Sequence, residues 1–153
     1  MMFVSRYPGI TSSVFVSSKK ATVQENIMNK YVDSLGLSDT QVYRTNMVMC
    51  STRSSSDLLL EHVLSCWLWK SLEMFTIGGT PKVIFPMCYE SMEFYLGINM
   101  SPSKVLGTIF QVSSPQGLYV VVPINHPTMS MRDSRDLADT LKVLEAIRIL
   151  NVM

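Results

Sequence analysis

An imidazole side chain stands where an apolar run ends. Residues 120–124 read VVVPI, and the chain continues as Asn125-His126-Pro127-Thr128 before a segment that carries serine and arginine. The sequence contains only two histidines. A histidine at the mouth of a buried strand can donate a hydrogen bond to a group bound beyond that strand. The other histidine, His62, lies in an expected helix, and we assign it no role.

Basic side chains occur in the loops that follow the expected strands. In open parallel sheets, ligands bind beyond the carboxyl ends of the strands, so these loops would border one edge. Only Asp57, Asp133 and Asp136 oppose the basic residues nearby. A basic edge suits a phosphate-bearing ligand, although ordinary solvated loop charge explains the same pattern equally well. The basic loop residues are Arg6, Lys19, Lys20, Arg53, Arg132 and Arg135.

Apolar runs and helical periodicities alternate along the chain. Short apolar or β-branched runs bounded by turn residues predict strands, and apolar positions at helical spacing predict helices. The expected strands cover 1–5, 42–49, 82–85, 108–112 and 119–122, with 108–112 at an edge. The expected helices cover 23–35, 54–75, 90–96 and 134–150. This alternation predicts an α/β fold with helices on both faces of a mostly parallel sheet.

The composition narrows the class of protein. The 153 residues are 47% hydrophobic and 16% charged, which predicts a single globular domain over 1–153. A net charge of +1 excludes a globally basic nucleic-acid binder, so any DNA contact depends on local clustering. No apolar run reaches the roughly 18 residues of a membrane span, and no signal peptide is visible. Three widely spaced cysteines indicate a reducing compartment, so we expect a cytoplasmic, nucleoid-associated protein.

Four stretches, in order, resemble motifs of the uracil-DNA glycosylase superfamily, and most closely its family 4. MFVSRYPG (2–9) resembles the first strand and loop, and SSVFVSSK (12–19) resembles the next segment, which carries a stacking phenylalanine. LGLSDTQVYRTNMVMC (35–50) resembles the motif that carries an asparagine, and INHPTMSM (124–131) resembles the His-Pro-Ser motif. Each motif is degenerate alone, but their order and spacing extend the resemblance from residue 2 to about residue 150.

The resemblance implies a three-layer αβα sandwich around a mostly parallel, four-stranded sheet, and excision of uracil or a related modified pyrimidine from DNA. Such an enzyme flips the nucleotide into a pocket and hydrolyses its N-glycosidic bond, which leaves negative charge on the base. The implied catalytic residues are His126, which would donate to the developing negative oxygen, and Asn46. The Asn46 amide presents a donor beside an acceptor, which fits the imide edge of uracil.

The resemblance also implies residues that hold the base and the DNA. Phe15 would stack on the flipped base, with Arg6, Tyr7 and Asn46 as further base-binding residues. The implied DNA-binding residues are Pro8, Gly9, Lys19, Lys20, Arg53, Thr128, Arg132 and Arg135. The expected partners are therefore DNA and, as a further partner, a replication or repair protein.

Each assigned role has a plainer alternative. Phe15 could cover the edge of a core, Asn46 could satisfy backbone groups of its strand, and His126 could be an ordinary loop residue. A catalytically silent module of this fold, binding DNA or a replication or repair protein, is therefore the second interpretation. A third, an unrelated doubly wound nucleotide-binding domain, is disfavoured because neither glycine-rich phosphate loop occurs.

The sequence departs from the family at the water-handling residue. The family's first loop carries a glutamate that handles the attacking water, and the matching residue here is Arg6. A guanidinium cannot act as a base near neutral pH, although a dissociative reaction needs little help from its water. Thr128 replaces the serine of the His-Pro-Ser motif and keeps a hydroxyl.

The second departure concerns iron. Family 4 members hold a four-iron cluster, which needs four thiolates. Only Cys50 and Cys66 match the family's ligands, the N-terminal cysteine pair has no counterpart in this chain, and Cys88 alone cannot complete the set. We therefore expect no metal and no cofactor.

Overall fold

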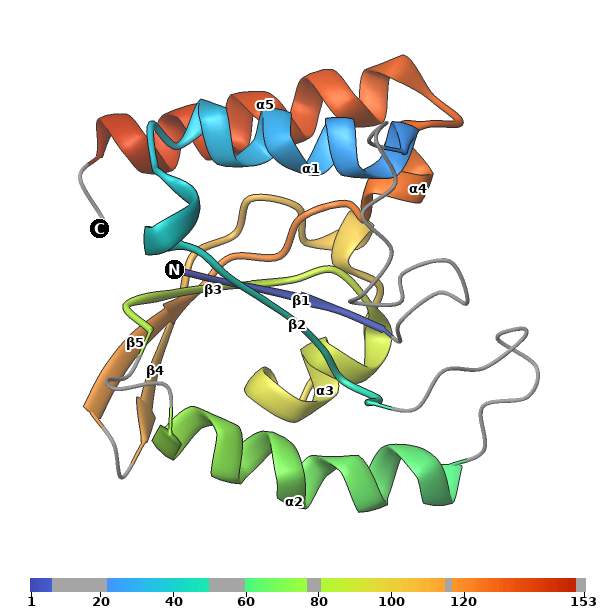
Figure 1. The fold of residues 1–153 in the computed structure, drawn as a ribbon, viewed down its shortest axis with the longest axis vertical. Helices are drawn as coiled ribbons and strands as arrows, with labels where there is room; N and C mark the ends of the chain where they lie inside the picture. The colour runs from blue at the N-terminus through green and yellow to red at the C-terminus, as the bar shows by residue number, and fades with distance from the viewer. Residues whose placement is uncertain (7–21, 50–59, 77–80, 115–116, 151–153) are drawn as a thin grey trace.

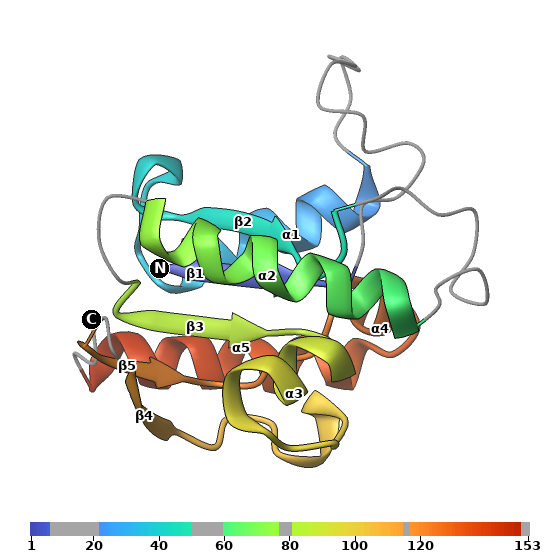
Figure 2. The same ribbon diagram turned by 90° about the horizontal axis from the view of Figure 1, so that it is seen from below.

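Five strands form one sheet in the order β2-β1-β3-β5-β4 within the part of the chain that the structure describes. The computed structural model describes residues 1–6, 22–49, 60–76, 81–114 and 117–150. Figure 2 shows the strands following one another in this order down the page. Their bounds are β1 Met2–Ser5, β2 Tyr43–Asn46, β3 Val83–Pro86, β4 Phe110–Ser114 and β5 Gly117–Val121. The pairs β1–β2, β1–β3 and β3–β5 are parallel, and β4 runs antiparallel to β5.

The four-stranded sheet implied by the family resemblance is therefore wrong. Residues 110–114 pair with β5 across a short connection and add a fifth strand at the edge. A short connection permits only antiparallel pairing, because a parallel neighbour needs a long crossover. The half-buried and exposed positions of β4 alternate, as expected for an edge strand with one face on the core.

Helices cover both faces of the sheet, as Figure 1 shows. α1 (Val23–Ser34) and α5 (Ser134–Ile149) lie on one face, above a core that contains Phe3, Tyr31 and Leu144. α2 (Leu60–Thr76) and α3 (Tyr89–Leu96) lie on the other face, where Met2 and Val4 are buried. Successive residues of β1 thus enter opposite cores, as the period of a strand requires. The prediction of an α/β fold with a central, mostly parallel sheet flanked by helices is confirmed.

Local signals in the sequence define where two of the long helices begin. α1 begins after Thr22, whose hydroxyl accepts from the backbone N–H of Glu25 at 3.2 Å, while the Glu25 carboxylate accepts from the Thr22 N–H at 2.5 Å. This reciprocal arrangement satisfies two donors at the start of a helix. α5 begins after Asp133, which accepts from the backbone N–H of Arg135 at 2.8 Å. None of the helices in the described ranges is long and apolar enough to cross a membrane.

The parallel strands carry several chain segments to the same edge of the sheet. β1, β2, β3 and β5 run in one direction, so their carboxyl ends lie together. The ladder continues past β5, because the N–H of Val122 donates to the Ile84 carbonyl at 2.9 Å and that of Ile124 donates to the Pro86 carbonyl at 3.2 Å. This extension brings Asn125 and His126 to the carboxyl edge, beside the end of β3.

Candidate functional site

A pocket of about 180 Å³ lies at the carboxyl edge of the sheet. Its walls come from the residue after β1, the segment that joins β3 to α3, the 3₁₀ turn Pro102–Lys104, the connection that follows β5, and the short helix α4 (Pro127–Ser130). Pockets for drug-sized ligands occupy roughly 300–1,000 Å³, so this one suits a smaller group. Its charged and titratable lining includes Arg6, Cys88, Glu90 and His126.

Hydrogen bonds hold the His126 ring and fix its tautomer. The backbone N–H of Thr128 donates to His126 Nδ1 at 3.2 Å, and the Thr128 hydroxyl lies 2.7 Å from the same nitrogen. Because a backbone N–H can only donate, Nδ1 must carry a lone pair, and the ring proton of the neutral form sits on Nε2. Nε2 lies 2.7 Å from Ser5 Oγ, so its N–H donates to that hydroxyl.

Burial lowers the pKa of His126 below its usual value of 6.5. The ring is therefore neutral at pH 7, in agreement with a lone pair on Nδ1. In this tautomer, Nε2 offers a proton to Ser5 and cannot accept one from it. The pair thus lacks the arrangement of a serine nucleophile with a histidine base, and His126 acts as a hydrogen-bond donor.

A buried tyrosine anchors the segment that carries His126. The Tyr31 hydroxyl donates to the backbone carbonyl of Asn125 at 3.2 Å and lies 2.7 Å from Ser130 Oγ. Tyr31 is fully buried on α1, and Asn125 and Ser130 are also buried. These contacts span both sides of His126 in the chain, so they restrict the position of its ring.

Asn46 lies on the far side of Ser5 from His126. It is the last residue of β2 and the register partner of Ser5 in the parallel ladder. Register partners point to the same face of a sheet. Arg44, two residues before Asn46 in β2, points to this face as well, where its Nη2 donates to Asn29 Oδ1 of α1 at 3.3 Å. Asn46 is half-buried and does not line the pocket that contains His126. The structure therefore brings Asn46 and His126 to the two sides of Ser5.

Arg6 is paired with a carboxylate that sequence reasoning missed. Its Nε donates to Glu90 Oε1 at 2.7 Å, and its Nη2 lies 2.5 Å from the same oxygen. Glu90 is in the first turn of α3, which follows the buried strand β3 at the carboxyl edge of the sheet. That position was the available signal, because a carboxylate there is favoured by the helix dipole and faces the place where ligands bind.

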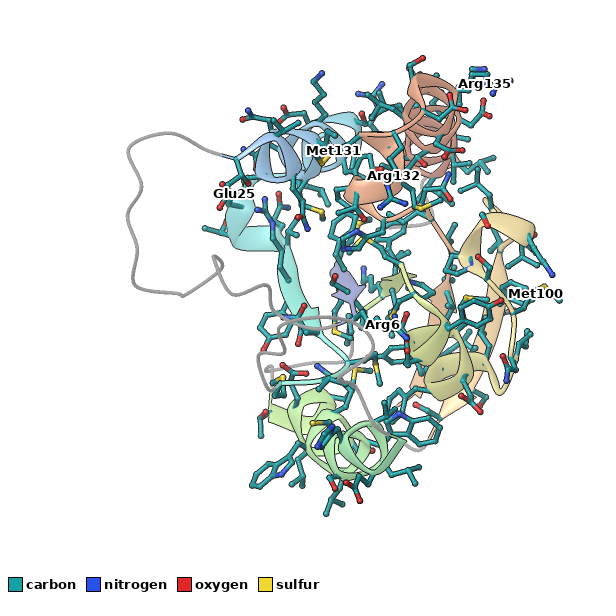
Figure 3. All side chains as sticks on the ribbon, turned by 90° about the vertical axis from the view of Figure 1, so that its right-hand side faces the viewer. Arg6, Glu25, Met100, Met131, Arg132 and Arg135 are labelled. Carbon is teal, nitrogen blue, oxygen red and sulfur yellow. The ribbon has the colours of Figure 1, made fainter. Side chains whose placement is uncertain are left out.

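The described residues of the expected DNA surface differ in their surroundings. Thr128 is exposed and bonds the His126 ring, Arg132 is exposed, and Arg135 is in an ion pair with Asp133 at 2.9 Å. Figure 3 shows Arg6 near the centre of this side of the molecule, Arg132 above it and Arg135 at the periphery. The remaining expected site residues, Tyr7, Pro8, Gly9, Phe15, Lys19, Lys20 and Arg53, lie outside the described residues.

The cysteines give no further information on a metal. Cys66 is buried in α2, Cys50 lies outside the described residues, and burial raises the pKa of the Cys88 thiol to about 12. In the described ranges, no group of three or more His, Cys, Asp or Glu side chains is placed to hold a metal ion. The expected lack of an iron cluster stays a prediction. No protein-family model matches the chain.

Protonation of His126 should destabilise the folded protein. Because the folded pKa lies below the usual 6.5, the unfolded chain binds the proton more readily. Stability should therefore be complete above pH 6.5 and should fall as pH decreases through 6.5 toward the folded pKa. Urea unfolding across this interval, for wild type and His126→Gln, measures the effect, and the difference between the two proteins should shrink at acid pH. A constant difference would contradict the lowered pKa.

Proposed function

We propose that this protein is a DNA glycosylase that flips uracil or a related modified pyrimidine out of DNA and hydrolyses its N-glycosidic bond. The observation that carries the proposal is His126: a neutral imidazole that lines a small pocket at the carboxyl edge of the sheet, with its Nε2–H held by Ser5 Oγ. The resemblance in sequence supports a uracil-DNA glycosylase-like fold, here with an added edge strand. An intracellular, nucleoid-associated location belongs to the same proposal.

Bond cleavage would use the His126 donor at the leaving base. When the bond between C1′ and the base nitrogen breaks, its electron pair stays on the base, and the negative charge is delocalised onto a carbonyl oxygen of the base. A preorganised donor stabilises such charge at no further cost of reorientation. Ser5 Oγ keeps the Nε2–H satisfied before a base arrives, and the hydroxyl can rotate to donate in its turn.

The other residues of the proposed site would bind and orient the nucleotide. Asn46 lies beside Ser5 on the neighbouring strand, where its amide could pair with the imide edge of the base. The resemblance adds Phe15 and Tyr7 as contacts to the extruded base. Arg132 and the other basic residues at this edge would contact phosphates, which supply sequence-independent affinity.

The Arg6–Glu90 ion pair favours a second candidate. An arginine bound to a protein carboxylate occupies the position where the resemblance places a free glutamate. A catalytically silent module that binds DNA or a replication or repair protein would tolerate this exchange. The two candidates differ in a direct assay, which is incubation with single- and double-stranded oligonucleotides that contain uracil, followed by alkali. Strand scission at the uracil supports the enzyme, and DNA binding without scission supports the silent module.

DNA binding should depend on the basic edge. Charge reversal of Arg132 and Arg135 together should weaken binding and reduce the slope of log K against log salt, by about 0.9 for each phosphate that the protein no longer neutralises. Arg132 should contribute more than Arg135, because Asp133 already compensates the charge of Arg135. Fluorescence anisotropy at several salt concentrations measures both effects. Lys82→Glu is the matched control, since Lys82 is exposed and precedes β3 at the opposite edge. An equally large loss of DNA affinity in Lys82→Glu would show that binding does not depend on the basic edge.

A further inference from the structure

Glu90 places a carboxylate with one unused oxygen at the pocket. Its side chain is 13% exposed, and both Arg6 donors contact Oε1 alone. Oε2 is buried and has no hydrogen-bond partner among the described residues. A buried carboxylate oxygen without a partner costs free energy, and such atoms in folded proteins call for a water, an ion or a functional role.

The ion pair brings this carboxylate to the end of β1. Arg6 directly follows β1, and Glu90 follows β3, which is the parallel neighbour of β1. The side chain of Arg6 points away from Ser5 and His126, because adjacent residues of an extended chain face opposite sides. Glu90 and His126 nevertheless line the same pocket, one from α3 and the other from the connection after β5.

We propose that Glu90 is a further catalytic residue, which orients and deprotonates the attacking water, and that Arg6 is its positioning residue. This inference rests on the proposed glycosylase function. The bond from C1′ to the base nitrogen breaks first, and the water oxygen then forms a bond to the positively charged C1′. The electron pair leaves with the base, whose oxygen accepts from His126 Nε2–H, and the proton of the water passes to Glu90 Oε2.

The arrangement explains why arginine occupies the position where the resembled family carries an acid. The carboxylate comes instead from α3, which follows the neighbouring strand β3, and the guanidinium holds it by Oε1, which leaves Oε2 buried and without a partner among the described residues. A glutamate at position 6 would face Glu90 at the same place, and two like charges in a half-buried site repel. Arg6→Glu alone should therefore perturb the site.

Three variants test the role of Glu90. Glu90→Gln keeps the size of the side chain and removes the base. The variant Arg6→Gln/Glu90→Gln removes both charges, so that no unpaired arginine remains. The variant Arg6→Glu/Glu90→Gln moves the carboxylate from α3 to the end of β1. Circular dichroism and urea unfolding show which of the three proteins fold.

The expected results concern single-turnover cleavage of uracil-containing single-stranded DNA. Glu90→Gln and the doubly neutral variant should both cleave roughly 10²-fold more slowly, at the low end for a positioned base, because a dissociative reaction needs little help from its water. The relocated carboxylate should restore most of the rate. Binding of Glu90→Gln to an oligonucleotide with 2′-fluoro-deoxyuridine, whose glycosidic bond resists cleavage, should change less than about twofold.

Two outcomes overturn the inference separately from the proposed function. If wild type cleaves and either neutral variant cleaves at the same rate, Glu90 has only a structural role and the glycosylase proposal stands. If wild type folds and binds DNA but cleaves no uracil or modified pyrimidine, the glycosylase proposal fails and Glu90 has no water to activate.

Discussion

Replacement of His126 by alanine is expected to lower kcat for uracil excision by about 10²- to 10³-fold, the usual loss for one well-placed donor to a developing anion. The neutral ring, its tautomer and its place at the pocket all favour donation from Nε2. KM should change little, because the donor acts on charge that develops in the transition state. Single-turnover rates on a uracil oligonucleotide measure the effect.

Two matched variants separate donation from positioning at this residue. His126→Gln places an amide N–H near the position of Nε2, so it should recover part of the rate that alanine loses. Thr128→Val removes the hydroxyl at 2.7 Å from Nδ1 but keeps the backbone N–H that fixes the tautomer, so its effect on the rate should be small. A rate for His126→Ala within about threefold of wild type would contradict the donor role.

The alanine variant should still fold, with a moderate decrease in stability. His126 precedes α4, accepts from the Thr128 N–H and contacts Ser5. Removal of a capping side chain typically costs about 1 kcal/mol. A rate deficit in His126→Ala that persists at saturating DNA, in a protein that unfolds cooperatively, therefore reports on chemistry.

Local periodicity was sufficient to predict most of the elements but not their arrangement. The expected helix over 134–150 corresponds to α5 at Ser134–Ile149, and the expected helix over 90–96 corresponds to α3 at Tyr89–Leu96. The strand expected over 42–49 is shorter, at Tyr43–Asn46. The edge strand expected over 108–112 corresponds to β4 at Phe110–Ser114. Strand order depends on pairing between distant segments, and no local pattern encodes that pairing.

His126 could be singled out as a candidate site residue from the sequence, whereas Glu90 could not, because its neighbours depend on nonlocal pairing. His126 stands out because a rare residue type follows an apolar run. Glu90 looks like any acidic residue in the first turn of a helix, and only the parallel pairing of β1 with β3 places it against Arg6, 84 residues away in the chain. The local sequence shows which side chains are present, but the pairing of distant strands determines which of them come into contact.

A buried lysine is the second consequence of this nonlocal pairing. Lys70 of α2 is fully buried, and its ammonium donates to Thr45 Oγ1 at 2.6 Å and to the Glu73 carboxylate. Burial lowers the pKa of Lys70. Burial alone would raise the pKa of Glu73, but hydrogen bonds from Lys70 and Tyr43 outweigh it, so the pKa is lowered. The pair is therefore ionic, and its hydrogen bonds with Thr45 and Tyr43 link α2 to β2.

Glu73→Ala is expected to lower the free energy of unfolding by about 3–5 kcal/mol, because it leaves an unpaired ammonium in the core. Lys70→Met/Glu73→Leu should cost far less than Glu73→Ala or increase stability, because burial of both charges is itself unfavourable. Urea unfolding at pH 7 measures all the variants. Glu145→Ala is the control: Glu145 pairs with Arg148 on the exposed surface of α5, and such a pair contributes at most about 1 kcal/mol. A similarly small decrease in the free energy of unfolding for Glu73→Ala would show that water reaches Lys70. Lys70 and Glu73 would then not stabilise the packing of α2 against β2.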